Sequence, residues 1–154
     1  MESINKIMAA IDLSDYSFET LKYAADLAGV CNAELIIVNV INQKDIDSIQ
    51  KIATISSGIS VAHYIEEQKG DRSIRIEKLM VEASCTNLST RIVFCIGYPF
   101  VELSKAVKDE GADLFVMGAK GRSNIANVLF GSTAEKMFRR CQIPLLSIRR
   151  RNEK

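Results

Sequence analysis

A glycine-containing stretch near the C-terminus is the feature that most limits what this chain can fold into. It follows a short apolar run, residues 113–117, of the kind that forms a fully buried strand. Gly118 and Gly121 open the stretch, Gly131 and Ser132 close it, and apolar residues then recur at helical spacing. The pattern therefore predicts a strand, a glycine loop and a helix, in that order.

Such a loop has a phosphate-binding interpretation and a purely structural one. Glycine lets a ligand approach the backbone closely, and a helix N-terminus presents unpaired N–H groups and the positive end of the helix dipole. Ser132 and Thr133 would add hydroxyl donors there. However, Ser132 and Glu135 also match the capping box S-x-x-E, in which the serine only caps the N-terminus of a helix. From spacing alone, both interpretations stay open.

Hydrophobic periodicity along the rest of the chain predicts the fold class. Five apolar runs typical of buried strands alternate with four predicted helical segments. The runs cover residues 4–11, 35–41, 91–96, 113–117 and 144–148. This alternation predicts an α/β fold, a doubly wound five-stranded parallel sheet with right-handed crossovers and helices on both faces. Residues 42–57 are expected to form a variable entry segment, although Ile49, Ile52, Ile59 and Ala62 suggest helical spacing in and just after it. A long helix ending near residues 83–87 should follow, and whether Gly70 lies inside it stays open.

Size and composition indicate one globular domain that covers residues 1–154. The 154 residues include 47% hydrophobic and 25% charged side chains, without a linker or an internal repeat. A net charge of +1 attracts neither nucleic acid nor membrane, so no partner of either kind is expected. The basic tail, residues 149–154, is interpreted as a solvated chain end. No apolar run approaches the ~20 residues of a membrane span. Because the N-terminus also lacks a signal-peptide pattern, a cytoplasmic location is expected.

The cysteines give no indication of a metal site. The four cysteines lie far apart without a C-x-x-C pair, and the single histidine, His63, is the only residue that could supplement them. In a reducing compartment, scattered cysteines usually act as small buried hydrophobes. We therefore expect no metal bound by protein side chains.

Asp12 is a second candidate site residue, found independently of the glycines. It follows the first apolar run directly. Doubly wound sheets bind ligands outside the carboxyl ends of their strands, where the strand order reverses. If the second and third strands lie on one side of the first, and the fourth and fifth on the other, Asp12 and Gly118 face the same crevice. A carboxylate there can accept hydrogen bonds from ribose hydroxyls. A plain role at the start of a helix is the alternative.

Taken together, these motifs resemble the universal stress protein family. The glycines and Ser132 match the pattern G-x2-G-x9-G-[S/T], and the A-A-I-D-L-S run at residues 9–14 and the G-Y-P run at residues 97–99 add to the likeness. It extends over about residues 6–149. The resemblance implies a sheet ordered 3-2-1-4-5 of the adenine nucleotide alpha hydrolase-like type. It also implies homodimers paired through the last strand, from Pro144 to Ile148, and ATP (or AMP or ADP) binding in members with the complete pattern.

The resemblance assigns roles to residues at the base and ribose end of a nucleotide. Asp12 would hold the ribose, the backbone of Val40 would meet the adenine edge, and Met117 would line the adenine or ribose pocket. For Val40 and Met117, an ordinary place in the core is the alternative, because most apolar residues at strand ends are core residues. Asn39 departs from the family, since histidine is frequent at this place in relatives.

The phosphate end is assigned in the same way. The amides of Gly118, Gly121 and Gly131 would hold phosphates. Ser132 and Thr133 would reach the terminal phosphates, with Mg²⁺ or Mn²⁺ bridging phosphate oxygens.

Arg122 and the absence of a catalytic pattern bear on whether the protein is an enzyme. Arg122 is either a solvated loop charge or a bidentate partner of phosphate. Efficient ATP hydrolysis needs a residue that orients water or takes its proton, whereas Asp12 is assigned to ribose. Gly121 is followed by Arg122, so no Walker pattern G-x4-G-K-[S/T] exists. The sequence favours a nucleotide-binding stress-response switch or sensor. A slow ATPase or autophosphorylating enzyme, and a dimeric interaction protein with a vestigial nucleotide pocket, are the alternatives.

Overall fold

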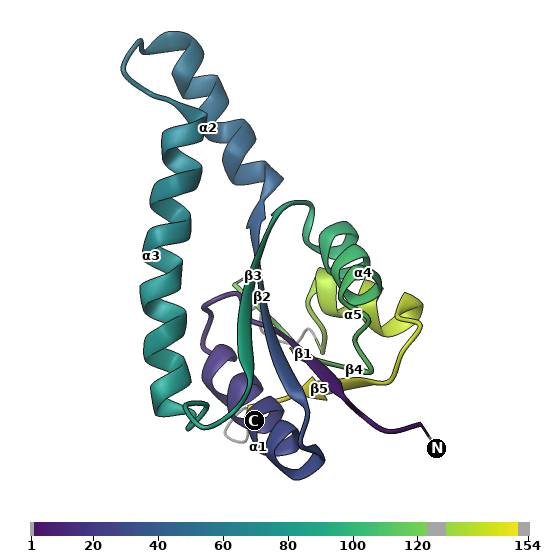
Figure 1. Cartoon of the computed structure of the whole chain (residues 1–154). Coiled ribbons are helices and arrows are strands. Elements are labelled where there is room, and N and C mark those ends of the chain that lie inside the picture. Colours follow the sequence, from purple (N-terminus) through teal and green to yellow (C-terminus); the bar gives the residue numbers. More distant parts are fainter. Residues whose placement is uncertain (1, 123–128, 151–154) are drawn as a thin grey trace.

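Five parallel strands form the central layer of the fold (Figure 1). The computed structural model describes residues 2–122 and 129–150. The strands are β1 (Lys6–Ala10), β2 (Glu34–Asn42), β3 (Thr90–Gly97), β4 (Leu114–Gly118) and β5 (Leu145–Ile148). Their order in the sheet is β3-β2-β1-β4-β5. This arrangement confirms the predicted fold class and strand order, and it places the reversal of strand order between β1 and β4.

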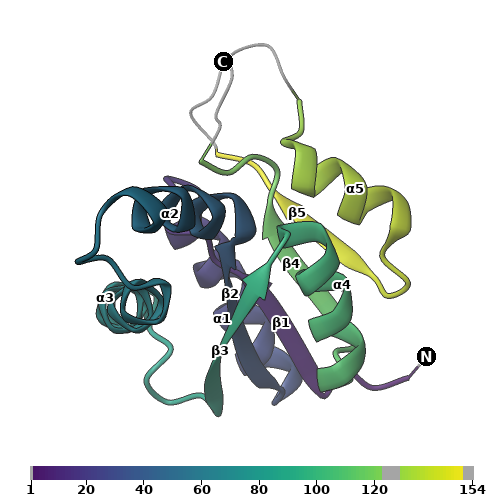
Figure 2. The same ribbon diagram turned by 90° about the horizontal axis from the view of Figure 1, so that it is seen from above.

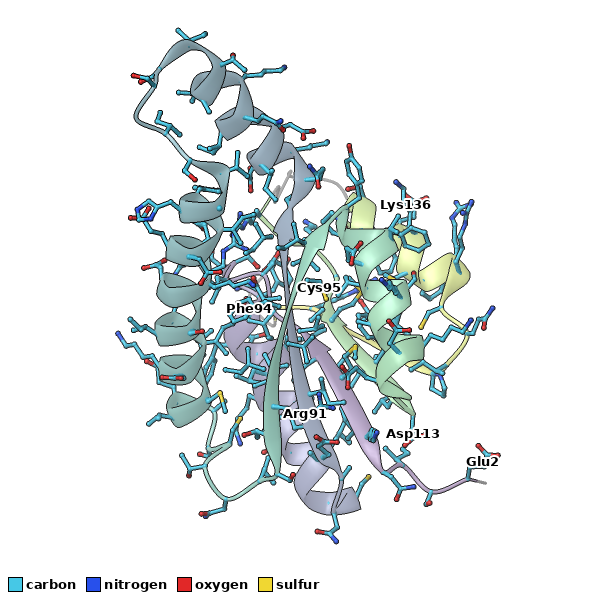
Figure 3. All side chains as sticks on the ribbon, turned by 45° about the horizontal axis from the view of Figure 1, so that its top comes forward. Glu2, Arg91, Phe94, Cys95, Asp113 and Lys136 are labelled. Carbon is cyan, nitrogen blue, oxygen red and sulfur yellow. The ribbon has the colours of Figure 1, made fainter. Side chains whose placement is uncertain are left out.

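Helices cover both faces of the sheet (Figure 2). The helices are α1 (Ser17–Cys31), α2 (Gln43–Ile55), α3 (Val61–Glu82), α4 (Pro99–Glu110) and α5 (Ser132–Arg140). On one face Ile7 packs in a buried cluster with α1 and α3, and on the other its neighbour Met8 packs in a second cluster with α4 and α5. Phe94 and Cys95 of β3 likewise point to opposite faces (Figure 3). Burial on both faces explains why the strands are near-continuous apolar runs.

The segment predicted to be variable contains a helix of its own, so the described residues hold five helices rather than the four predicted. Asn42 begins α2, because its side chain accepts a hydrogen bond from the Lys44 amide at 3.0 Å. Ile46 anchors the helix in the core with 6% of its surface exposed. The far end of α2 and the start of α3 extend beyond the sheet (Figure 1). The long helix predicted next is α3, which ends at Glu82.

Gly70 lies inside α3, which settles a point that the sequence left open. A Cβ atom at this position would meet no other atom within 4 Å. Glycine in the middle of a helix loses more backbone entropy on folding than alanine does. We therefore expect Gly70→Ala to raise the free energy of unfolding by about 0.5–1 kcal/mol, measured by urea denaturation. An unchanged or lower free energy of unfolding would contradict this expectation.

Arg91 joins three elements on the surface. Its Nε lies 2.8 Å from Glu34 Oε1 of β2, and its Nη2 lies 2.6 Å from Glu110 Oε2 of α4. The charge-assisted hydrogen bond from Arg91 lowers the pKa of Glu110. A carboxyl whose pKa is lower in the folded state contributes stability above its unfolded pKa, and loses it as the pH falls through the folded value.

This ion pair predicts a small pH-dependent change in stability. At pH 6 we expect Arg91→Gln to lower the free energy of unfolding by less than about 1 kcal/mol, since the arginine is partly exposed. The difference from the wild type should shrink as the pH is lowered below about 4, because Glu110 becomes protonated in both states. Arg75→Gln is the control, since the Arg75–Asp71 contact is 3.9 Å long and exposed. A difference for Arg91→Gln that grows at low pH would refute the interpretation.

The cysteines and the histidine lie apart from one another. Cys85 is buried, the other three cysteines are half-buried, and all four are free thiols. His63 lies exposed on α3 beside Glu67, with 3.1 Å between His63 Nε2 and Glu67 Oε1. Among the described residues, no three His, Cys, Asp or Glu side chains lie close enough together to hold a metal ion. Within the same part of the chain, no helix is both long and apolar enough to cross a membrane.

Candidate functional site

The candidate site begins where β1 ends and the chain turns toward α1. The Asp12 carboxylate is held in place through Oδ1, which accepts hydrogen bonds from the Ser14 amide at 2.9 Å and the Ser17 hydroxyl at 3.3 Å. Its other oxygen, Oδ2, faces the glycine loop so closely that a Cβ atom on Gly121 would overlap it. Asp12 and Gly121 therefore lie against each other, as the predicted strand order requires.

The glycine loop is closed by its own backbone hydrogen bonds. After Gly118 ends β4, the Ala119 amide donates to the Ile148 carbonyl at 2.8 Å, and the Gly131 amide donates to the Ala119 carbonyl at 2.9 Å. The second bond brings the start of α5 beside Gly121, because it joins the two ends of the loop. The Gly131 amide, expected from the resemblance to hold phosphate, is thus engaged within the loop in this structure.

The start of α5 has no side-chain cap. Gly131 is the N-cap residue, and Ser132 is already the first helical residue. The capping box considered for Ser132 and Glu135 is therefore not formed; the Glu135 carboxylate instead pairs with Arg139 at 3.1 Å. The amides of Ser132, Thr133 and Ala134 make no hydrogen bond to another described residue. These first-turn N–H groups, with the positive end of the helix dipole, are suited to an anion.

A cleft of about 560 Å³ joins these parts at the carboxyl ends of β1, β2 and β4. Every candidate site residue predicted from the sequence lines it, namely Asp12, Val40, Met117, Gly118, Gly121, Arg122, Gly131, Ser132 and Thr133. Val38, Leu103 and Met117 supply an apolar wall on the α4 and α5 side. The cleft thus pairs an apolar end with an end of backbone donors, at the place where doubly wound sheets bind ligands.

Several lining residues were not predicted from the sequence. Asn42 and Lys44 line the cleft because α2 starts at its edge, and residues 42–57 gave no sign of this. Phe130 also lines it, stacked on Phe138 at 5.7 Å between ring centroids and covered by the Arg149 guanidinium at 5.8 Å. The position of an aromatic residue directly before Gly131 was the one feature of the sequence that could have indicated Phe130 as a site residue.

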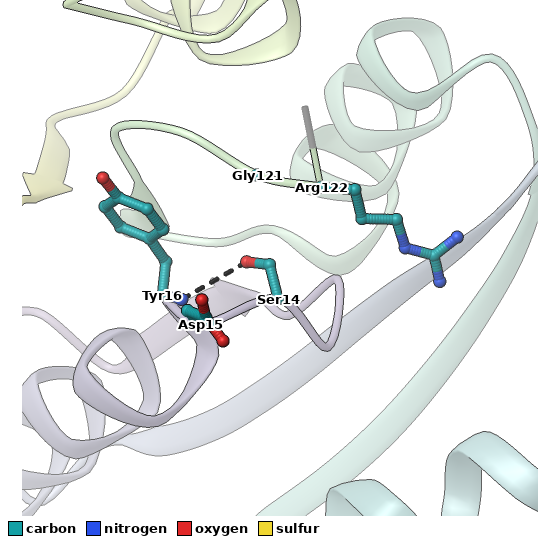
Figure 4. Close-up of a pocket in the computed structure, with 5 residues that line it drawn as sticks. All are labelled: Ser14, Asp15, Tyr16, Gly121 and Arg122. Atoms are coloured by element: carbon teal, nitrogen blue, oxygen red, sulfur yellow. Dashed lines mark hydrogen bonds between the residues drawn. The ribbon is translucent and has the colours of Figure 1, made fainter. Parts of the chain in front are cut away.

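Arg122 links the glycine loop to two other elements. Its Nε donates to the Asp12 carbonyl at 3.2 Å, and its Nη1 lies 3.9 Å from Asp45 Oδ2 of α2. A second pocket of about 270 Å³ lies beside the cleft, lined by Ser14, Asp15, Tyr16, Gly121 and Arg122. Tyr16 and Arg122 lie at opposite ends of this pocket (Figure 4). Because the Arg122 side chain is about half exposed, it has room to turn toward the cleft or toward the second pocket.

Comparison with known proteins identifies the family. A model of the universal stress protein family matches residues 3–149. The chain belongs to the universal stress protein family. Universal stress protein MJ0577 of Methanocaldococcus jannaschii is 25% identical over 96% of each chain. Universal stress protein YxiE of Bacillus subtilis is 28% identical over 94% of this chain and 99% of its own.

Solved structures of universal stress proteins share this fold. The structure of MJ0577 superposes with a TM-score of 0.82 at 22% identity, covering 99% of this chain and 100% of that one. A universal stress protein in complex with cAMP gives a TM-score of 0.63 at 21% identity, with 96% and 98% covered. A universal stress protein of Archaeoglobus fulgidus in complex with dAMP gives 0.63 at 16% identity, with 97% and 100% covered.

Proposed function

We propose that this universal stress protein binds ATP, or another adenine nucleotide, in the cleft between β1 and β4 and acts as a dimeric stress-response switch or sensor. One observation carries the proposal: the Asp12 carboxylate and the first-turn amides of α5 line the same cleft, with Gly121 packed against the carboxylate. The relatives solved with cAMP and dAMP add support, because both ligands are adenine nucleotides.

Each part of the cleft fits a part of the nucleotide. Asp12 Oδ2 would accept a hydrogen bond from a ribose hydroxyl, and the apolar wall that includes Met117 would cover the base. The amides and hydroxyls of Ser132 and Thr133, together with the Gly118 and Gly121 backbone, would surround the phosphates. The Arg122 guanidinium would turn from Asp45 toward them. Mg²⁺ or Mn²⁺ would come with the phosphate oxygens, since such ions prefer oxygen ligands and often bind through substrate phosphates.

Calorimetry with ATP and with AMP, each with and without Mg²⁺, tests nucleotide binding. We expect saturable binding of at least one nucleotide. Absence of both heat and thermal stabilisation at millimolar nucleotide would refute the proposal and favour an interaction protein with a vestigial pocket. A turnover assay on the same samples separates a switch from a slow ATPase, because a switch gives little or no product.

The dimer is proposed to form through β5, the outer strand of the sheet on the β4 side. β5 pairs with β4 along one edge, and Leu145, Leu146 and Ser147 are partly exposed. An uncharged sheet edge of this kind is usually covered or paired, and two-fold pairing with a second copy would do so. Sedimentation at micromolar concentration tests this proposal, and a single monomer peak would refute it.

A further inference from the structure

Arg72 of α3 is a buried cation held by neutral oxygens. Only 3% of its surface is exposed. Its Nη1 donates to Asn39 Oδ1 at 2.9 Å and to the Val40 carbonyl at 3.1 Å, and its Nε donates to Gln68 Oε1 at 3.1 Å. Within residues 2–122 and 129–150, no carboxylate lies within salt-bridge distance of this guanidinium. Burying a charge without a carboxylate partner costs free energy of folding. We therefore ask whether the contacts of Arg72 have a functional role in addition to packing.

Burial and the charged groups around Arg72 act on its pKa in both directions, and the net effect is to lower it. Burial lowers the pKa of Arg72, and the nearby Arg122 charge lowers it further. Tyr64 and Asp45 raise the pKa of Arg72, but the Asp45 carboxylate is also paired with Arg122. Arginine nevertheless remains protonated in proteins. The Val40 carbonyl therefore accepts a hydrogen bond from a full positive charge.

The Val40 peptide groups lie at the open edge that forms part of the cleft. β2 runs past the end of β1, because the last paired residues are Ala10 and Val38, and the Ile11 amide donates to the Val38 carbonyl at 2.9 Å. Alternate residues of a strand direct their N–H and C=O groups to the same side. Val40 thus directs both groups toward the space beyond β1. Arg72 donates to the carbonyl, whereas the Val40 N–H makes no hydrogen bond to another residue in the described part of the chain and can serve a ligand.

We propose that Arg72 makes the base subsite insensitive to the 6-amino group of adenine, so that the cleft recognises the base through its unprotonated ring nitrogen N1. The inference rests on the proposed nucleotide site. The edge of adenine presents one donor, the 6-amino group, and one acceptor, N1. The Val40 N–H can bond N1. The carbonyl that would accept from the amino group already accepts a charge-assisted hydrogen bond, which is about twice as strong as a neutral one.

The ligand class that follows is purine nucleotides with an unprotonated N1, whether or not they carry a 6-amino group. Hypoxanthine and guanine nucleotides are disfavoured, because their N1 carries a hydrogen that would face the Val40 N–H. Arg72 is therefore a specificity-determining residue that acts through Val40. Replacing Arg72 should therefore change the relative affinity for different bases, whereas loss of a purely structural role would weaken the binding of all nucleotides alike.

The test compares ATP with purine riboside 5′-triphosphate, which differs from ATP in lacking the 6-amino group. For the wild-type protein, calorimetry should give dissociation constants for the two within about twofold of each other, because the amino group gains no net hydrogen bond. Arg72→Met frees the Val40 carbonyl, so ATP should then be favoured by about fivefold, the factor expected for one net hydrogen bond. Arg75→Met, on the exposed side of the same helix, should keep the wild-type ratio.

Three results would overturn the inference. One is a wild-type preference for ATP of about fivefold or more, which would show that the carbonyl accepts both donors. Another is a ratio that Arg72→Met leaves unchanged, and the third is an equal change in Arg75→Met. If Arg72→Met fails to fold, the wild-type comparison still decides. Binding of neither nucleotide would refute the proposed function and this inference together, whereas binding that depends on the amino group in the wild type would refute this inference alone.

Discussion

Gly121→Ala is expected to lower the affinity for ATP by about tenfold or more, the factor for loss of a hydrogen bond to a charged group. The added methyl group would overlap Asp12 Oδ2, the oxygen that faces the cleft. The carboxylate would then have to turn away from the ribose, or the loop would have to move away from β1. Calorimetry on the variant and the wild type measures the effect. An unchanged dissociation constant would contradict both the contact and the role of Asp12.

A double-mutant cycle isolates this contact from other effects of the substitution. In the wild-type background, Gly121→Ala should lower the free energy of unfolding by about 1–3 kcal/mol through steric overlap. In an Asp12→Ala background the overlapping oxygen is gone, so the cost should fall close to zero. Gly58→Ala is the matched control, since a Cβ atom there meets nothing within 4 Å. Equal costs for Gly121→Ala in both backgrounds would show that Asp12 is not the group it meets.

Gly118→Ala should lower the free energy of unfolding by about 1–3 kcal/mol, the usual cost of overfilling a packed site. A Cβ atom there would lie 2.8 Å from Tyr16 Cβ and 2.9 Å from the Lys120 carbonyl oxygen. Tyr16 is 2% exposed, and the other contact is backbone, so neither neighbour can move aside at little cost. Urea denaturation measures the change.

A second substitution, at Tyr16, tests whether the loss of stability in Gly118→Ala comes from overlap with the Tyr16 side chain. In Gly118→Ala, Tyr16→Gly should cost less than it does in the wild type, because it removes both Tyr16 Cβ, at 2.8 Å from the added methyl group, and Tyr16 Cγ, at 3.2 Å. If the costs of the Gly118 and Tyr16 substitutions in free energy of unfolding are strictly additive, the clash with the Lys120 carbonyl dominates. No loss of stability in Gly118→Ala would mean that the turn after β4 adjusts freely.

The strands and the meeting of Asp12 with the glycine loop could be predicted from the sequence. Buried parallel strands leave long apolar runs, and the topology of such sheets fixes which loops share an edge. Ile49 and Ile52 recur at helical spacing, but a separate helix at residues 43–55 was not predicted, because only Ile46 of this helix is buried and its spacing gave no boundary with the long helix that follows. The start of α5 at Ser132 agrees with the helix predicted after the glycine loop. The hydrogen bond from the Gly131 amide to the Ala119 carbonyl could not be read from the spacing. Arg72 was likewise beyond prediction, since its partner Asn39 is 33 positions away.

The cleft is assembled from segments that only the fold brings together, as the Arg122–Asp12 hydrogen bond over 110 positions shows. An unfolded chain therefore has no site, and any ligand of the cleft binds the native state alone. At a concentration 100 times its dissociation constant, such a ligand adds about 2.7 kcal/mol to the free energy of unfolding. Where proteases act on the unfolded chain, the lifetime of the protein would then rise and fall with the supply of that ligand, and its abundance would itself record that supply.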